Sequence, residues 1–460
     1  MSNNRRRRQN LPAHPETLTI ERMSHEGRGV ARIDGKIAFV DGALTGETVT
    51  ATFTSRRSQF DELKLLEVLQ ASEKRVQAPC SVAAICGGCL LQHMRLDAQI
   101  ELKQQVLFDH LKHTAGIIDY SVLPAMTSST QSYRRKARLA VRYVHKKSDV
   151  LVGFREKANT FITDMDHCTT LVPAVGNLIK PLRALILSLD GCRDIPQIEI
   201  AVGEKLCVTT EQLDSVLRVT MTLRHMEPLS EADRQKLRDF ADHYQIEWFL
   251  QSGGPNTVMR FWPETADNHL QYFLPDDTGD LCISFFPGDF TQVNADINRK
   301  MIHQTIELLD LKDDDNVLDL FCGLGNFTLP MARRCLSVTG VEGSEDMVVR
   351  AALNAQNNQL LNTRFFSADL FTDFDSTRWA TSGYSKLLLD PPRSGAIELV
   401  SRIRELLPQV IVYVSCNPAT LARDAAELTK QGYRLTHAGV MDMFPHTGHV
   451  ESMARFERVK

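Results

Sequence analysis

Short segments of alternating apolar and polar residues open the chain. The candidate strands are residues 18–20, 29–33, 37–40 and 49–53, and turns that contain glycine separate them. Short strands at this spacing are typical of a small closed β-barrel. The preceding residues, 1–13, are polar and rich in arginine, and we interpret them as a disordered basic tail that either contacts phosphates or only keeps the chain in solution.

The middle of the chain mixes helical and strand patterns. Between Asp97 and His113 the apolar residues recur at helical spacing, and a second helix is expected near residues 231–243. Segments 197–202, 216–223 and 257–262 have the apolar pattern of short strands. These elements predict an α+β central domain.

From about residue 286 onwards, apolar strands alternate with helical stretches. The strands are 316–320, 337–342, 386–389 and 409–414. Such alternation predicts a parallel, doubly wound, Rossmann-like sheet. A chain of 460 residues exceeds what one hydrophobic core usually organises. We therefore expect an α/β protein with a tail at 1–13, a β-barrel at 14–72, the central domain at 73–285 and the doubly wound domain at 286–460.

Composition narrows the class of protein. No apolar run approaches the roughly 20 residues that a membrane-spanning helix needs, and the arginine-rich N-terminus does not resemble a secretion signal. We therefore expect a cytoplasmic protein with no membrane partner. Ten cysteines in such a chain do not indicate disulfides, because cytosolic thiols are kept reduced. Metal binding or catalysis is expected to use some of them.

A basic segment is hidden by the net charge of -4. Between Tyr133 and Lys157 the chain has nine basic and two acidic residues, a surplus of seven positive charges. Apolar residues alternate with the charges from Ala137 to Tyr143, so the segment predicts a strand with one basic face. That face either binds RNA or is only solvated.

A loop with two glycines follows the first strand of the predicted doubly wound sheet. Phe321, Gly323 and Asn326 belong to this loop, and Glu342 ends the next strand about 20 residues later. A carboxylate at this place can accept hydrogen bonds from both ribose hydroxyls of an adenosine moiety. The loop alone does not distinguish a structural turn, an NAD site and another adenosine site.

Two further strands of this sheet are followed by residues that can take part in a chemical reaction. Asp390 begins a rigid Asp-Pro-Pro-Arg turn, and Cys416 follows a buried strand with Pro418 close behind it. A thiol at the substrate edge of a parallel sheet can serve as a nucleophile. The competing interpretation is an inert, buried cysteine.

The chain resembles two known families. Residues 25–31, 35–40 and 46–47 resemble the TRAM domain, an OB-like RNA-binding module of RNA-modifying enzymes. The segment Ser-Cys-Asn-Pro-Ala-Thr-Leu-Ala-Arg-Asp at 415–424 resembles the nucleophile motif of the RNA uridine-5 methyltransferases, and Asp-Pro-Pro-Arg at 390–393 resembles methyltransferase motif IV. The second resemblance spans nearly the whole chain, implies methyl transfer from S-adenosylmethionine to carbon 5 of a uridine, and excludes most dehydrogenases.

This resemblance also implies roles for individual residues. Cys416 is expected to add to carbon 6 of the uracil, and Glu451 to remove the proton from carbon 5. His446 and His449 are rival bases, because an imidazole titrates near about pH 6.5. The expected contacts with S-adenosylmethionine are Gln292, Phe321, Gly323, Asn326, Glu342, Asp369 and Asp390. On composition alone, the segment of Gln292 and the side chain of Asp369 could equally be helix caps.

Four cysteines form a candidate metal site. Cys80, Cys86 and Cys89 lie within ten residues, and Cys168 is the candidate fourth ligand. Four thiolates suit zinc or an iron-sulfur cluster, and spacing barely separates the two. The resemblance implies a [4Fe-4S] cluster with a structural role, because the TRAM-bearing branch of the family carries one on this set.

The substrate follows from the branch of the family. A TRAM domain together with a cluster is the combination of the branch that methylates 23S rRNA, which implies a target uridine flipped out of a loop and no obligate protein partner. Three alternatives stay open on the sequence: a tRNA uridine-5 methyltransferase, a non-catalytic RNA-binding protein with a cluster, and an amino-methyltransferase that acts on an exocyclic nitrogen.

Overall fold

The computed structural model describes residues 11–12, 14–208, 213–372, 379–380 and 383–459. The basic tail expected at residues 1–13 therefore lies outside the described residues, apart from two of its positions, 11 and 12. The chain divides into two compact units. The first contains residues 1–106 and 444–449, and the second contains residues 107–443 and 450–460.

The first unit contains a six-stranded sheet with the order β1-β5-β6-β4-β3-β2. Its strands are β1 (Glu16–Thr19), β2 (Arg22–Met23), β3 (Gly29–Ile33), β4 (Lys36–Asp41), β5 (Thr48–Arg56) and β6 (Phe60–Gln70). Val40, Val49 and Leu63 are fully buried in its core. The expected strands are present. Strand β6 was missed, because its second half carries exposed charged and apolar residues without a clear alternation.

A buried ion pair fixes the segment that leaves this sheet. Glu47 is fully buried, and its carboxylate accepts hydrogen bonds from Arg75 and from the backbone of Leu44. Helix α1 (Leu96–His113) follows, close to the predicted bounds. Gln99 in its first turns donates to the carbonyl oxygens of Leu91 and Met94, so the cysteine-bearing loop before the helix is held at its end.

A six-stranded sheet with the order β13-β12-β11-β10-β8-β9 belongs to the second unit. It consists of β8 (Lys136–Val144), β9 (Asp149–Gly153), β10 (Gln197–Val208), β11 (Leu213–Arg224), β12 (Ile246–Gln251) and β13 (Val258–Trp262). Helices α2 (Pro173–Gly176), α3 (Ile179–Ser188) and α4 (Glu231–Tyr244) and the 3-10 turns 145–147 and 255–257 accompany it. In β8, Arg138 and Arg142 are exposed while Leu139 and Val141 are buried, so the predicted basic strand face is confirmed.

A hairpin connects this sheet to the C-terminal part of the second unit. It consists of β14 (Leu270–Leu274) and β15 (Leu281–Phe285), and β14 also packs against β10. Helix α5 (Ala295–Leu309) follows, and Asn294 caps it by accepting a hydrogen bond from the backbone of Ile297. The side chain of Asn294 also donates to Ser128, so the start of α5 is held in place.

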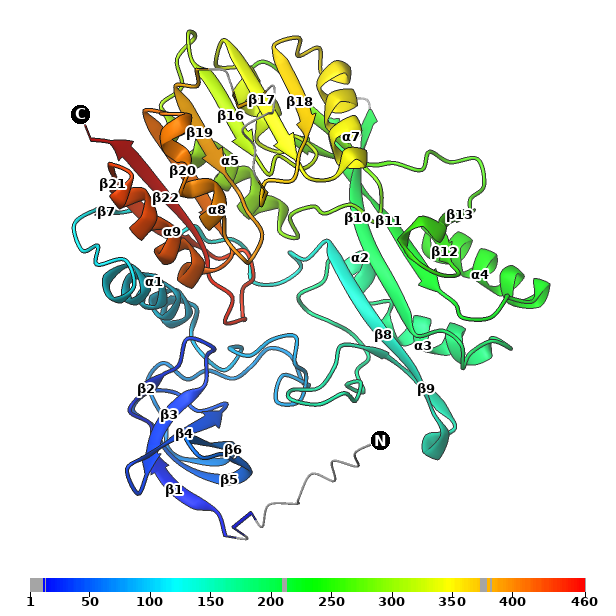
Figure 1. Cartoon of the computed structure of the whole chain (residues 1–460). Coiled ribbons are helices and arrows are strands. Elements are labelled where there is room, and N and C mark those ends of the chain that lie inside the picture. The colour runs from blue at the N-terminus through cyan, green and yellow to red at the C-terminus, as the bar shows by residue number, and fades with distance from the viewer. Residues whose placement is uncertain (1–10, 13, 209–212, 373–378, 381–382, 460) are drawn as a thin grey trace, which may run out of the picture. The chain divides into compact units, whose positions relative to one another are not determined.

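The C-terminal part is built on an eight-stranded sheet with the order β18-β17-β16-β19-β20-β22-β21-β7 (Figure 1). The strands are β16 (Asn316–Leu320), β17 (Ser337–Glu342), β18 (Thr363–Ser367), β19 (Lys386–Leu389), β20 (Val410–Ser415), β21 (Tyr433–Met441), β22 (Glu451–Arg458) and β7 (Ser121–Val122). Helices α6 (Thr328–Ala332), α7 (Glu345–Asn357), α8 (Ile397–Val400) and α9 (Pro418–Lys430) and a 3-10 turn at 403–405 complete it.

The pairing of these strands determines where a ligand can bind. Strands β16 to β20 are parallel, which confirms the α/β class and the doubly wound sheet. Strand order reverses at β16, since β17 and β18 lie on one side of it and β19 and β20 on the other. Doubly wound sheets bind ligands beyond the carboxyl ends of their strands at such a switch point. Strand β22 runs antiparallel between β20 and β21 and brings a later segment to the same edge.

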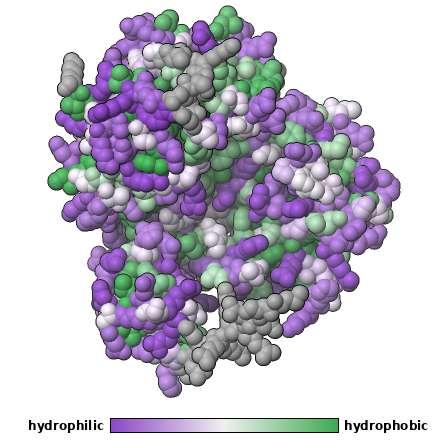
Figure 2. Space-filling view, viewed as in Figure 1, coloured by the Kyte–Doolittle hydropathy of each residue, from purple (hydrophilic) through white to green (hydrophobic). Residues whose placement is uncertain are grey.

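Hydrophilic side chains cover much of the face in Figure 2, with hydrophobic residues distributed between them. Among the described residues, no helix has the length and apolar character to cross a membrane.

Candidate active site

Cys416 lies in the two-residue link between β20 and α9. Ser415 accepts a hydrogen bond from the backbone N–H of Asn417 at 3.1 Å and donates its hydroxyl to the carbonyl oxygen of Asn417 at 3.0 Å. The Asn417 side chain caps α9 by accepting from the backbone of Ala419. These bonds fix the backbone around the thiol, which is itself partly exposed.

Glu451 is brought to this thiol by strand register. Ser415 at the end of β20 pairs with Ser452 in β22, so Cys416 and Glu451 occupy neighbouring positions at the same end of the sheet. Glu451 is partly buried and is the first residue of β22. The structure therefore brings the expected nucleophile and the expected base together.

The environment of Cys416 favours the neutral thiol. Burial raises the pKa of Cys416 to about 11, the carboxylates of Glu451 and Asp390 add to this rise, and the cation of Arg393 opposes it. At neutral pH the thiol therefore keeps its proton in the absence of substrate.

Asp390 follows β19 and stands beside the glycine loop. Its backbone N–H donates to the carbonyl oxygen of Leu320 at 3.3 Å, and burial raises its pKa to about 7. The carbonyl oxygen of Arg393 in the same turn accepts hydrogen bonds from Asn417 at 3.2 Å and from Thr420 at 3.4 Å. The Asp-Pro-Pro-Arg turn and the cysteine loop are thus bonded to each other.

A buried carboxylate that the sequence analysis did not single out fixes both loops. Asp424 in α9 is fully buried and accepts hydrogen bonds from the backbone of Ala396 at 2.7 Å and from the hydroxyl of Tyr413 at 2.6 Å, and it also pairs with Arg423. A Cβ on Gly395 would lie 2.6 Å from its oxygen. The quoted motif at 415–424 includes Asp424, but only tertiary structure shows what it holds.

The glycine loop and Glu342 are in direct contact, as expected. Oε2 of Glu342 accepts the backbone N–H of Gly323 at 3.2 Å, and Oε1 accepts that of Ser344 at 3.1 Å. Gly323 and Gly325 both have positive φ, and a Cβ on Gly325 would lie 2.4 Å from Leu329. The loop conformation therefore depends on glycine.

Asn326 of the same loop is held by two residues that the sequence did not reveal. Its Oδ1 accepts hydrogen bonds from the Tyr272 hydroxyl at 2.9 Å and from Asn298 at 3.0 Å, and its amide donates back to Asn298 at 2.9 Å. Burial raises the pKa of Tyr272. No local pattern could identify these partners, because they lie 54 and 28 residues away along the chain.

Asp369 lies on an exposed turn after β18. Its carboxylate accepts a hydrogen bond from the backbone N–H of Phe371 at 3.0 Å. The backbone N–H of the adjacent Ala368 donates to the backbone carbonyl oxygen of Glu342 at 3.1 Å. The ring of Phe371 lies 5.8 Å from that of Phe321. Asp369 and Phe321 are therefore close to Glu342, where the sequence predicts an adenosine moiety.

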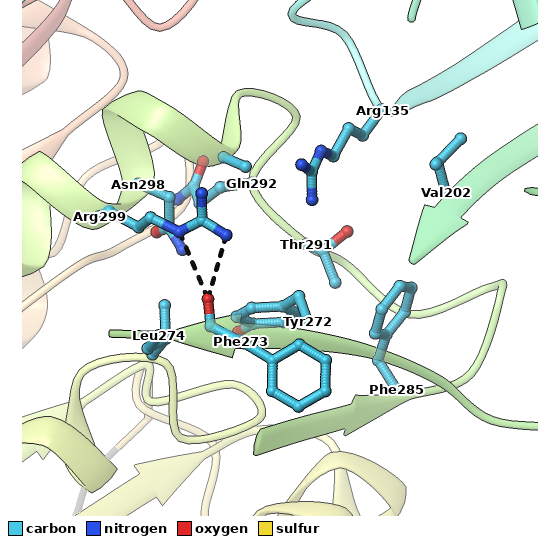
Figure 3. Close-up of a pocket in the computed structure, with 11 residues that line it drawn as sticks. Arg135, Val202, Tyr272, Phe273, Leu274, Phe285, Thr291, Gln292, Asn298 and Arg299 are labelled. Carbon is cyan, nitrogen blue, oxygen red and sulfur yellow. Dashed lines mark hydrogen bonds between the residues drawn. The ribbon is translucent and has the colours of Figure 1, made fainter. Parts of the chain in front are cut away.

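A pocket that opens to solvent adjoins the glycine loop on the side of α5 (Figure 3). It is lined by the expected cofactor contact Gln292, by Asn298, and by side chains from β10, β14 and β15. Asn298 lines the pocket and also bonds to Asn326, so the pocket lies next to the glycine loop. Gln292 therefore lies within reach of the same ligand as the loop.

The two rival bases belong to the first unit. His446 is buried, its backbone N–H donates to Gln99 at 3.0 Å, and its ring nitrogen lies 3.3 Å from the Gln99 amide. The ring of His449 lies against Phe444. The buried position and the Gln99 contacts are those of a structural imidazole for His446.

The four cysteines of the candidate cluster are divided between the two units, with Cys80, Cys86 and Cys89 in the first and Cys168 in the second. In the first unit the backbone N–H of Gly88 donates to the sulfur of Cys86 at 3.4 Å, a bond of the kind that stabilises a ligating thiolate. In the second unit the sulfur of Cys168 lies 3.3 Å from the hydroxyl of Thr170. Within the described ranges, no three His, Cys, Asp or Glu side chains are grouped to hold a metal ion. The donor set suits a cluster, and its assembly stays a prediction.

Comparisons with known proteins agree with this site. A family model described as tRNA (Uracil-5-)-methyltransferase matches residues 264–459, and the TRAM domain model matches residues 16–60. A protein of Hahella chejuensis called 23S rRNA (uracil(1939)-C(5))-methyltransferase RlmD is 49% identical over 98% of this chain and 99% of its own length. A protein of the same name from Alcanivorax borkumensis is 48% identical over 99% of each chain.

The fold also has a solved relative. The structure of the Pyrococcus abyssi tRNA (uracil-54, C5)-methyltransferase in complex with S-adenosyl-L-homocysteine matches 96% of this chain and all of that chain, with a TM-score of 0.72 and 24% identity. At that identity the likeness concerns the fold.

Proposed function

Because this chain belongs to the family of RNA uracil-C5 methyltransferases, we propose that it transfers the methyl group of S-adenosylmethionine to carbon 5 of a uridine in 23S rRNA, giving 5-methyluridine. The relatives' names give that uridine as position 1939, and we propose the equivalent uridine here. S-adenosylmethionine supplies the methyl group as a sulfonium.

Cys416 and Glu451 divide the chemistry between them. The thiol of Cys416 gives its proton to water, and the thiolate adds to carbon 6 of the uracil, which makes carbon 5 nucleophilic. Carbon 5 then forms a bond to the methyl carbon, and S-adenosylhomocysteine leaves with the electron pair of the broken bond. Glu451 removes the proton from carbon 5, and the carbon 5–carbon 6 double bond re-forms as the thiolate leaves carbon 6.

One observation carries this proposal: the pairing of β20 with β22, which puts the thiol of Cys416 beside the carboxylate of Glu451 at the switch-point edge. An amino-methyltransferase needs no thiol at that place. RNA that contains 5-fluorouridine at the target has no carbon 5 proton to lose, so the thiol adduct should be trapped on it. A covalent complex on denaturing gels with the wild type, and none with Cys416→Ala, is expected, and a fully active Cys416→Ala variant would remove the mechanism.

The target itself can be tested in cells. We expect 5-methyluridine to disappear from a single position of 23S rRNA in a strain that lacks the protein, and to return when the gene is supplied. Disappearance of 5-methyluridine from tRNA instead would favour the tRNA-acting alternative. The uridine has to be flipped out of its stack to reach Cys416, at a cost of a few kcal/mol.

We also propose a [4Fe-4S] cluster bound by Cys80, Cys86, Cys89 and Cys168. The number and type of these ligands and the N–H bond to the Cys86 sulfur support it. Anaerobically purified protein should contain about four irons and absorb near 400 nm, and a Cys89→Ser variant should lose the iron. Stoichiometric zinc in place of iron would overturn this assignment.

Organisation and location complete the proposal. We retain the basic tail at 1–13, the TRAM domain at 14–72, a central domain at 73–285 and the methyltransferase domain at 286–460, with the cofactor contacts given by the sequence. We further propose that the protein acts in the cytoplasm and needs no obligate protein partner.

A further inference from the structure

Two arginines share one buried carboxylate in the pocket beside α5. Glu204 in β10 is 2% exposed, and its Oε1 accepts hydrogen bonds from Arg135 at 2.5 Å and from Arg299 at 2.9 Å. Its Oε2 accepts the backbone N–H of Phe273 at 2.9 Å. Burial alone would raise the pKa of Glu204. The charge of Arg135 and these hydrogen bonds lower it by more, so the pKa of Glu204 lies below its usual value.

The charges of this cluster do not cancel. Two guanidinium groups against one carboxylate leave one positive charge in a pocket whose other walls include Val202 and Phe285. Arg299 also donates hydrogen bonds from Nε and Nη2 to the carbonyl oxygen of Phe273. In the described part of the chain, Nε and Nη2 of Arg135 and Nη1 of Arg299 bond to no acceptor.

The guanidinium groups point into the same space. Figure 3 shows Arg135 and Arg299 approaching it from opposite sides, with Thr291 and Gln292 beside them. Convergent, uncommitted N–H donors with a surplus positive charge are suited to an anion with two oxygens. Glu204 fixes both groups in advance, so that little side-chain order has to be gained on binding.

The neighbouring residues indicate which anion is bound. Asn298 lines the pocket and bonds to Asn326 of the glycine loop, and Gln292 lines it as well. Gln292 and Asn326 are both proposed contacts of S-adenosylmethionine. We propose that Arg135 and Arg299 bind the α-carboxylate of the methionine part of this cofactor, an inference that rests on the proposed function.

A phosphate of the RNA backbone fits the pocket less well. The side chains of Arg135 and Arg299 are only 20% and 36% exposed. A backbone phosphate is attached to a nucleoside on each side, and both would have to come close to these poorly exposed guanidinium groups. A carboxylate at the free end of a flexible chain meets no such restriction.

The test compares two ligands that differ in the amino-acid part. S-adenosylhomocysteine carries the carboxylate, and 5'-methylthioadenosine lacks it. For Arg299→Gln and Arg135→Gln, calorimetry should show an affinity for S-adenosylhomocysteine about 10- to 100-fold weaker than that of the wild type, as expected for lost charge-assisted hydrogen bonds. The affinity for 5'-methylthioadenosine should stay as in the wild type.

Arg334→Gln is the matched control. Arg333 and Arg334 also share one poorly exposed carboxylate, that of Asp276, but they do not line the pocket. This variant should bind both ligands as the wild type does. Circular dichroism establishes that each variant is folded, and Arg299→Lys, which keeps the charge, should recover part of the lost affinity.

Other outcomes would overturn the inference. An equal loss for both ligands would mean that the arginines only maintain the pocket, and a loss of RNA affinity with unchanged S-adenosylhomocysteine binding would assign them to a phosphate. A wild-type protein that binds neither ligand would instead contradict the proposed function itself.

Discussion

Cys416 must change its protonation state during the proposed reaction. Its surroundings include two carboxylates and one guanidinium, and with burial they raise the pKa of the thiol to about 11. A group with so high a pKa is stable as a neutral thiol while the site is empty. The thiolate is then generated when the substrate is in place, which limits side reactions of an activated sulfur.

Replacing Glu451 tests this electrostatic account. Glu451→Gln removes a negative charge beside Cys416, so the pKa of the thiol should fall and its alkylation by iodoacetamide at pH 8 should become about 3- to 10-fold faster. Methylation should fall at the same time, because the proposed base is lost. Mass spectrometry of the peptide that contains Cys416 measures the rate.

Glu457→Gln is the control, since Glu457 lies at the far end of β22 and pairs with Arg455.

For the wild type, alkylation of Cys416 should rise about tenfold per pH unit between pH 7 and 10, because the thiolate fraction rises in that proportion below the pKa of about 11. A rate that is flat over this range would show that the thiol is already ionised.

Tyr272 is a positioning residue in this site. Tyr272→Phe removes the hydroxyl that holds Asn326, so we expect the KM for S-adenosylmethionine to rise about 5- to 10-fold, as for one lost hydrogen bond, with kcat little changed. Tyr433→Phe, which removes a buried hydroxyl that donates to the carbonyl oxygen of Pro408, is the control for a lost hydroxyl outside the site. A fall in kcat alone would contradict the positioning role.

At the scale of elements, the active site depends on loops that follow strands rather than on the strands themselves. The turn after β19 and the link after β20 are bonded to each other, and the buried Asp424 of α9 bonds to Ala396 beyond that turn and to Tyr413 in β20. A carboxylate with partners on three elements is costly to disturb, because each partner would be left buried and unsatisfied.

Asp424→Asn should therefore destabilise the protein by about 1–3 kcal/mol, the range for buried hydrogen-bond partners left unsatisfied, because Arg423 itself is 41% exposed. Urea unfolding measures this, and Tyr413→Phe, which removes one partner, should cost only about 1 kcal/mol. Equal costs for the two variants would mean that the hydroxyl, and not the ion pair with Arg423, dominates.

The elements also show which predictions sequence supports. Strands β3, β16, β17 and β19 have the expected bounds, because continuous apolar runs or clear alternation mark buried strands. Cys416 and Glu451 were found by motif, and the register that joins them was not predictable. Tyr272, Asn298 and Asp424 act through partners that are distant in the chain, and such contacts leave no local pattern.

At the scale of the whole molecule, the proposed catalytic residues and the TRAM match lie in different units of the chain. The proposed catalytic and cofactor residues belong to the second unit, whereas the TRAM match at residues 16–60 lies in the first. Binding of the large substrate can therefore be weakened without affecting the small one. The exposed basic face of β8 gives a place to test this separation.

Arg142→Gln should weaken RNA binding several-fold and reduce the slope of log affinity against log salt by about one, as for one lost phosphate contact. S-adenosylhomocysteine affinity should not change. Fluorescence anisotropy with an rRNA fragment measures the slope, and Lys430→Gln on α9 is the control for loss of an exposed charge. An unchanged slope would assign the face to solvent.

Strand β7 has a consequence for solubility. Its residues 121–122 pair with β21, and the backbone hydrogen bonds continue from Leu123 to Ala438 and from Met126 to Val440. An open strand at the margin of a large sheet invites another molecule to add its own strand there. Here residues 121–126 of the same chain already bond to backbone groups along the edge of β21. A second molecule therefore cannot add its own strand to that part of the edge.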